Sequence, residues 1–122
     1  IGIGRRTLFT NTTGNNNLAI GFAALRNHNG GTNNSAIGNN TSIGNSLTNA
    51  TVIGSNASAT TSNSLVLGSI NTVNGATASV NVGIGTTAPT NPLHVVGTIR
   101  MVDGNQALGK VLTSDANGVA SW

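Results

Sequence analysis

Hydrophobic residues in this chain recur in a short sequence motif, in which small or aliphatic residues precede an aliphatic residue and a glycine. We call each copy of this motif a phrase. The phrase is written LAIG, SAIG, TSIG, TVIG and LVLG, and the residues between its copies are mostly Asn, Thr, Ser and Gly. From Ile3 onward the aliphatic-glycine step recurs at intervals of 17, 17, 16, 14 and 17 residues, with Ile43-Gly44 as an additional copy inside the third interval. Repeats built from helix pairs need about 33 residues or more. The period therefore predicts one coil of a β-solenoid, made of two short strands and two turns.

Each phrase is predicted to be a strand, in which the aliphatic side chain points to the face opposite its two neighbours. The intervening TNTTGNNN and NHNGGTNN are rich in Gly and Asn, which tolerate left-handed conformations and form tight turns. No segment has the length or periodicity of a helix. We therefore expect an all-β fold, a repetitive parallel β-roll or β-solenoid with coils of 14 to 17 residues. We interpret the aliphatic residues as the structural core of the repeat, with Ile20 filling its coil: Ile3, Ile20, Ile37, Ile43, Ile53, Leu67 and Ile84.

The pattern changes near residue 86, where Pro89 and Pro92 restrict the chain and interrupt regular pairing. Beyond them LHVVGTIRMV and KVLTSDA are predicted strands, and Asn117-Gly118 is a strong signal for a hairpin turn. The sequence thus predicts a repeat body over residues 1–85 and a short β-meander connector over residues 86–122. We expect the chain to be a piece of a longer protein that continues downstream.

The energetics of such thin coils favour an oligomer. One coil encloses only one or two large aliphatic side chains, each contributing roughly 1.5–3 kcal/mol on full burial, whereas ordering the backbone costs roughly 1–2 kcal/mol per residue. Aromatic residues, at 2% of the chain, add little. Packing the aliphatic faces of several identical chains about a common axis would bury more, and ladders of Asn and Thr would satisfy polar groups between coils. We expect a homo-oligomer.

Charge is scarce, at 6% of residues against roughly 25% in typical proteins. The net charge of +3 comes from five scattered basic residues against two aspartates, without the stacking aromatics of a nucleic-acid surface. No nucleic-acid partner is expected. No apolar run approaches the roughly 20 residues of a spanning helix, so no membrane insertion is expected in this segment. The chain has no cysteine, which excludes disulfides and thiolate metal sites.

Residues 51–68, TVIGSNASATTSNSLVLG, resemble the 14-residue repeat of trimeric autotransporter adhesin heads, and NTTGNNNLAIGFAALRN resembles a longer variant in tail-fibre-like bacterial surface proteins. The segments NVGIGTTAPTNPLHVVGTIRM and DGNQALGKVLTSDANGVASW resemble connectors of large fibre proteins. The resemblance implies a left-handed parallel β-roll, assembled as a homotrimer and projecting from a bacterial surface. The spacing here is mostly 16 to 17 residues, so some coils should carry longer corner loops.

Motifs that suggest catalysis lack their structural context. Gly83, Gly85 and Ala88 fit G-x-G-x-x-A, but two nearby prolines deny the helix that a dinucleotide site needs. The segment GNQALGK fits a phosphate loop only until Val111, which replaces the Mg²⁺-binding Ser or Thr. The chain has no Glu, and its two histidines show no metal-ligand spacing. We expect no enzymatic activity, no cofactor and no metal site.

The variable loops are the best candidates for contact with a partner. Four residues in them form the candidate surface contact loop, and His28 is expected to be exposed in its Gly/Asn-rich stretch: Arg5, Arg6, Arg26 and His28. Alternatively, these arginines only solvate a surface of low charge. The expected function is a structural and adhesive segment of a trimeric extracellular fibre on a bacterial surface. Its expected partners are its own copies, neighbouring fibre segments, and a host glycan or protein receptor.

Two alternatives stay open. The first is the same architecture in the tail fibre of a phage or of a contractile injection system, which would place the chain on a virion or tail appendage. The second is a glycan- or ice-binding β-solenoid that uses flat ladders of Thr and Asn. Against ice binding, no Thr-x-Thr recurs at the coil period.

Overall fold

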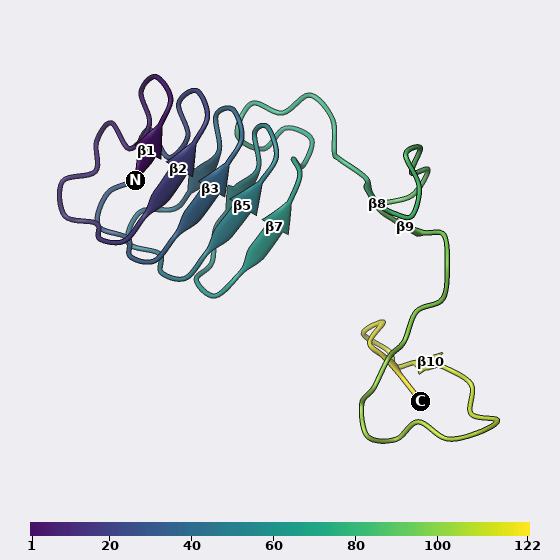
Figure 1. The fold of residues 1–122 in the computed structure, drawn as a ribbon. Helices are drawn as coiled ribbons and strands as arrows, with labels where there is room; N and C mark the ends of the chain where they lie inside the picture. The colour runs from purple at the N-terminus through teal and green to yellow at the C-terminus, as the bar shows by residue number, and fades with distance from the viewer.

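The computed structural model describes residues 1–122 and contains eleven short β-strands and no helix, which confirms the all-β prediction. Strands β1 to β7 build a stacked body, and the last four strands form two small pairs apart from it (Figure 1). The strands of the body are β1 (Gly2–Ile3), β2 (Leu18–Ile20), β3 (Ser35–Ile37), β4 (Ser42–Ile43), β5 (Thr51–Ile53), β6 (Ser58–Ala59) and β7 (Leu65–Leu67). The remaining strands are β8 (Val82–Ile84), β9 (Leu93–Val95), β10 (Thr113–Ser114) and β11 (Ala120–Ser121).

The body is a β-solenoid of about four turns. One strand of each coil joins a parallel five-stranded sheet in the order β1-β2-β3-β5-β7. Each phrase pairs in register with the next, so that Ile20 lies beside Ile37 and Ile37 beside Ile53. On the other side of the coils β4 pairs with β6, also in parallel. The aliphatic-glycine period is therefore the coil of the solenoid, as predicted.

We number the coils from each aliphatic residue of the five-stranded sheet: coil 1 covers residues 3–19, coil 2 residues 20–36, coil 3 residues 37–52 and coil 4 residues 53–66. The first corner of a coil is constant in length, because backbone hydrogen bonds align Leu25 of coil 2 with Ser42 of coil 3 and Ser42 with Ser58 of coil 4. All differences in coil length therefore fall beyond this point, in the second half of the coil. The longer corner loops expected from the spacing lie there.

The interior of the coils is filled by small side chains. Ala19, Ala36 and Val52, the middle residues of their phrases, are each 0% exposed. They pack with Ala24, Leu25, Ala50, Ala57 and Ala59 in one core cluster that also contains Ile43.

The interpretation of seven aliphatic residues as the core is correct for Ile43, which is 3% exposed, and is wrong for the others. Strand alternation turns the last aliphatic residue of each phrase away from the buried middle residue. Five of them therefore lie on the outer face of the five-stranded sheet, and we call them the aliphatic strip: Ile3, Ile20, Ile37, Ile53 and Leu67.

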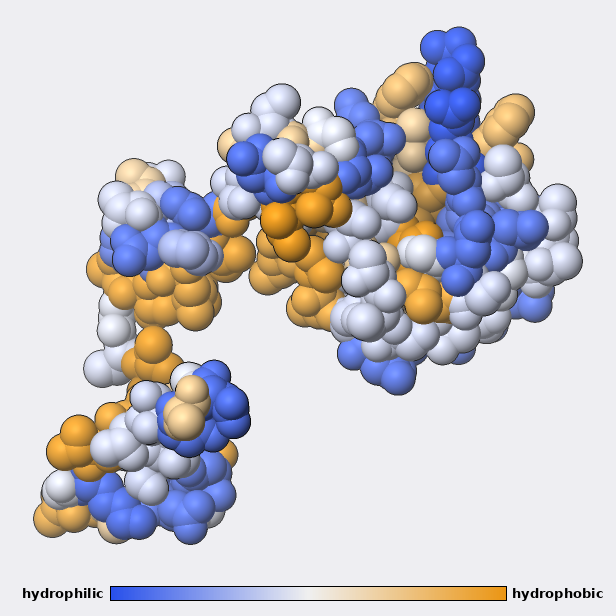
Figure 2. Space-filling model, turned by 180° about the vertical axis from the view of Figure 1, so that it is seen from behind, coloured by the Kyte–Doolittle hydropathy of each residue, from blue (hydrophilic) through white to orange (hydrophobic).

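Beyond β7 the chain folds back over the last coil and then leaves the body. The Val80 amide donates to the Ser69 carbonyl at 2.9 Å. β8 pairs in parallel with β9, with Ile84 opposite Val95, and does not join the sheet of β7. Ile84 thus belongs to the β8–β9 pair and extends neither the five-stranded sheet nor the core. Figure 2 shows apolar surface on this pair and on the end of the body nearest to it.

The Asn117-Gly118 turn was correctly predicted as a hairpin. β10 and β11 pair antiparallel on either side of it, and the Gly118 amide donates to the Asp115 carbonyl at 3.1 Å. The Asp115 carboxylate accepts the amide hydrogens of Asn117 and Val119 at 2.8 and 2.9 Å, which fixes the turn.

Candidate functional site

The four residues of the candidate surface contact loop do not share one environment. Arg5, Arg6 and Arg26 are exposed, whereas His28 is 2% exposed, so its expected exposure is wrong. His28 Nδ1 lies 3.1 Å from the Ile43 carbonyl oxygen, and Nε2 lies 3.3 Å from the side-chain nitrogen of Asn34. Because a carbonyl only accepts, Nδ1 carries the proton and Nε2 accepts from the amide of Asn34. These two bonds compensate the burial of the ring.

Two buried asparagines continue this polar network through the second corner. Asn17 donates to the Gly31 carbonyl at 2.8 Å and accepts the Asn34 amide hydrogen at 3.0 Å. Asn34 repeats the arrangement one coil later, donating to the Leu47 carbonyl at 2.8 Å and accepting the Ala50 amide hydrogen at 2.9 Å. The sequence reasoning missed this ladder. Its signal was the period-2 alternation, because each Asn stands two residues before a buried Ala.

A pocket of about 280 Å³ opens between coils 2 and 3 beside Arg26. The backbone bonds place Leu25 opposite Ser42 and Asn29 opposite Asn45, so coil 2 carries one more residue than coil 3 between these points. The backbone hydrogen bonds between coils 2 and 3 are interrupted over this extra residue, and the pocket lies at the interruption.

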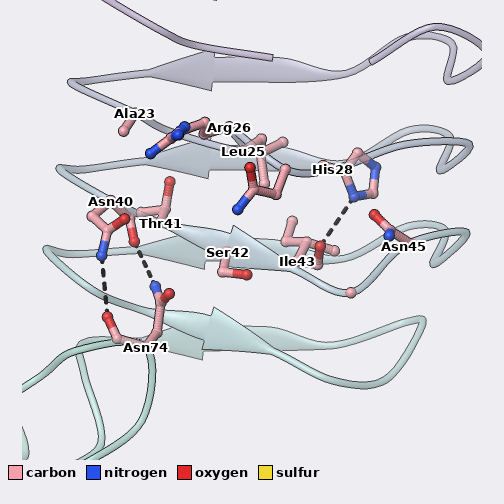
Figure 3. A pocket seen from close by; sticks show the side chains of 12 residues that line it. Ala23, Leu25, Arg26, His28, Asn40, Thr41, Ser42, Ile43, Asn45 and Asn74 are labelled. Carbon is pink, nitrogen blue, oxygen red and sulfur yellow. Dashed lines mark hydrogen bonds between the residues drawn. The ribbon is translucent and has the colours of Figure 1, made fainter. Parts of the chain in front are cut away.

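The polar walls of the pocket come from three separate segments. Figure 3 shows Arg26 above Thr41, and below them Asn40 and Asn74, which are joined by two hydrogen bonds. Asn74 belongs to the loop after β7, 34 residues further along the chain. His28 lies on the other side of the pocket, bonded to Ile43.

Two side chains at the pocket have hydrogen-bonding capacity left over. Thr41 is 2% exposed, and its Oγ1 has no hydrogen-bond partner. The Arg26 backbone is fixed, since its carbonyl accepts from the amide and the hydroxyl of Thr10, both at 3.1 Å. Its guanidinium has no acidic partner, because the chain's only acidic residues are Asp103 and Asp115, far along the sequence. The pocket is therefore rich in donors and contains no carboxylate.

The motifs set aside in the sequence do not assemble a reaction centre in the structure. Gly83 lies in β8 and Gly85 directly after it, and no helix follows. Lys110 Nζ donates to the Asn105 carbonyl within its own loop. No group of three or more His, Cys, Asp or Glu side chains is placed to share a metal ion. The structure also contains no helix that could span a bilayer.

The aliphatic strip is the other unusual surface. Ile37 and Ile53 are each 41% exposed, although strand pairing places them side by side in a sheet. Leu18, Ser35, Thr51 and Leu65 share this outer face, because each stands two residues before a member of the strip. Neighbouring strands lie about 4.8 Å apart, so the strip runs straight across the coils.

No family model, curated protein or solved structure matches this chain.

Proposed function

We propose that the chain is a structural and adhesive segment of a trimeric extracellular bacterial fibre, which acts by stiffness and by displaying loops in three copies. The aliphatic strip is the observation that carries this proposal. Contiguous exposed apolar surface in a soluble protein marks an interaction site, and here it lies on a regular sheet that no other part of the chain covers.

The shape of the strip suits a symmetric assembly. A straight row of equivalent Ile and Leu side chains presents the same pattern at every coil, so identical chains can pack strip to strip about one axis. Closed symmetric assemblies are the usual form of homo-oligomers. Polar Ser35 and Thr51 on the same face would then lie at the rim of the interface.

Side-chain amide ladders support the role as a stiff element. Asn16 donates to Asn33 at 3.2 Å, Asn49 to Asn63 at 3.0 Å and Asn40 to Asn56 at 3.0 Å, each bond joining successive coils. Together with the backbone ladders they tie every coil to the next. Three such bodies side by side would resist bending, and three copies of each loop would raise the avidity of weak contacts.

The test is the mass of the assembled chain in solution. Sedimentation equilibrium and light scattering of the full chain should give three times the chain mass, with melting temperatures that rise with concentration. Ile37→Glu combined with Ile53→Glu should dissociate the assembly, because both introduce charge into the interface. The control Asn39→Glu, at an exposed corner, should leave the mass unchanged. A monomer that keeps its β-structure at micromolar concentration would overturn the proposal.

A phage or injection-system tail fibre would use the same architecture, and tail-module genes beside the coding sequence would favour it. A glycan- or ice-binding solenoid has one observation in its favour, since Asn15, Thr32 and Thr48 stack as a row of parallel bridges. Thermal hysteresis that is lost in Thr32→Val would support ice binding. Its absence in the wild type would reject ice binding.

A further inference from the structure

We propose that the pocket between coils 2 and 3 binds a carboxylate-bearing sugar unit, of the sialic or uronic acid class, through Arg26. This inference deepens the proposed adhesive role. It rests on the proposed function in one respect, namely that the assembled trimer leaves the pocket open. The position of the pocket, its unused hydrogen-bond donors and its size support this ligand class.

The pocket lies on the side of the coils opposite the aliphatic strip, because its lining includes Ser42 and Ile43 of β4 and no residue of the five-stranded sheet. Ala36 of β3 and Ile43 of β4 both point into the same core cluster, from opposite sides of coil 3. The outer faces of β3 and β4 are therefore directed away from each other. An assembly formed through the strip would leave the pocket open, once in every chain.

The wall of the pocket offers an unusual set of donors. Ser42 donates its amide hydrogen to the carbonyl of Ala57, just before β6, at 2.9 Å, and Gly44 donates to the carbonyl of Ala59 in β6 at 3.0 Å. The Ile43 amide between them points to the opposite edge, towards coil 2, where the carbonyl of the same residue accepts from His28. Coil 2 bulges at this point because of its extra residue. An edge amide of β4 is thereby directed towards the pocket.

Thr41 supplies the second independent observation. A buried hydroxyl without a partner costs about 1–3 kcal/mol, so native structures rarely keep one, and this hydroxyl is on the pocket wall. A bound hydroxyl or carboxylate oxygen would give it the missing hydrogen bond. Binding would thus satisfy the one buried side-chain polar atom that the chain itself leaves unpaired.

Charge and size select the ligand class. A single guanidinium without a neighbouring acid attracts an anion, and it binds a carboxylate in a bidentate manner. The rest of the polar lining is neutral, with the side-chain amides of Asn27, Asn40, Asn45 and Asn74, and suits hydroxyl groups better than a second negative charge. A volume of about 280 Å³ lies just below the roughly 300–1,000 Å³ typical of drug-sized ligands. One sugar ring with one carboxylate fits these limits.

Titration of the full chain by calorimetry and NMR tests the inference, with N-acetylneuraminate and glucuronate as probes, glucose as the neutral ring, and acetate as the carboxylate without a ring. The acidic sugars should bind, and glucose should bind at least tenfold more weakly. Arg26→Gln should weaken binding of the acidic sugars at least tenfold, whereas the control Arg5→Gln, which removes the same charge outside the pocket, should not. Thr41→Val should weaken binding several-fold without lowering the melting temperature.

Each contrary result overturns a defined part of the inference. No binding of either acidic sugar overturns it outright, as does binding that survives Arg26→Gln. Acetate that binds as tightly as the acidic sugars shows a small-anion site and removes the sugar. Sedimentation of the same samples separates this inference from the proposed function, because a trimer that binds no sugar rejects only the pocket, and a sugar-binding monomer rejects only the trimer.

Discussion

His28 is buried with one hydrogen-bond partner at each of its ring nitrogens. The Ile43 carbonyl accepts from Nδ1, and the Asn34 side chain donates to Nε2. The ring also lies directly against Gly31, where an added Cβ would collide with Nε2 and Cε1. The imidazole thus joins coil 2 to coil 3 at the place where their backbone ladder is interrupted.

We predict that His28→Ala lowers the free energy of unfolding by about 2–4 kcal/mol, because it removes both hydrogen bonds and leaves a cavity. Arg26→Ala, two residues away and exposed, should change it by no more than about 0.5 kcal/mol. Urea unfolding followed by circular dichroism measures both. If the two variants were equally stable, His28 would have no part in holding the coils together.

The side chains that fill the coils could be predicted from the sequence only in part. The alternation of side chains along a strand correctly places Ile37 on the face opposite its neighbours, but it does not tell which face points into the coil. The size of the side chains decides this, because the narrow interior of a coil admits Ala36 or Val52 and leaves the larger aliphatic residues outside. A signal was available in the first position of each phrase, where Ser35 and Thr51 share a face with the aliphatic residue. A face that accepts polar residues in half of its coils is the outer one.

At the scale of the elements, the glycine that ends each phrase allows the coils to stack closely. Gly38 has a φ of 140°, and a Cβ there would lie 2.5 Å from the carbonyl oxygen of Gly54 in the next coil. Gly30 also has a positive φ, of 80°, but a Cβ there would meet nothing closer than 3.4 Å. A comparison of Gly38 with Gly30 therefore distinguishes the effect of a steric collision from that of backbone strain alone.

Gly38→Ala should therefore destabilise the solenoid body by several kcal/mol, since it adds a collision with the next coil to the backbone strain of a positive φ. Gly30→Ala should cost about 1 kcal/mol, the usual penalty for a left-handed non-glycine residue. Thermal melts of both variants give the comparison. Equal melting temperatures would show that the coils can separate to accommodate a methyl group.

The C-terminal segment is closed by two hydrogen bonds from Trp122, one of which goes to the carboxylate of Asp103. The Asn105 amide donates to Asp103 Oδ1 at 2.8 Å and is the main cause that lowers the pKa of Asp103, with a smaller contribution from the Trp122 amide at 3.3 Å. The indole nitrogen of Trp122 donates to the Met101 carbonyl at 2.9 Å. Residues 101 to 122 are thus held as a loop by bonds at its two ends.

Because the pKa of Asp103 is lower in the folded chain, its contribution to loop closure is present at neutral pH and is lost as the pH falls below about 4. Trp122 is the only tryptophan, so its fluorescence reports the opening. We expect an acid transition in the wild type that is absent in Asp103→Asn and retained in Asp115→Asn. A transition that persists in Asp103→Asn would assign it to another group.

For the whole molecule, the repeat period was enough to predict the solenoid, since every coil must return the chain to the same edge of one sheet. The pocket could not be predicted in this way. The pocket depends on one extra residue in coil 2, between Leu25 and Asn29. This extra residue can be recognised only once hydrogen bonds have aligned Leu25 with Ser42. Likewise, Ile84 carries the phrase of the repeat but pairs with β9, because its sequence gives no information on which strand lies beside it.

The ladders that hold the coils together are uncharged. Both aspartates lie beyond residue 85, so no side-chain ion pair can form within the coils, and their side-chain hydrogen bonds join amides, hydroxyls and one imidazole to each other and to backbone groups. Raising NaCl from about 0.05 to about 1 M shortens the Debye length to about 3 Å and weakens charge-charge attraction, but leaves such bonds in place. The melting temperature of the roll should therefore stay constant over this range, and a steady fall would point to hidden electrostatic support. A filament built this way would keep its form in fresh water and in brine alike.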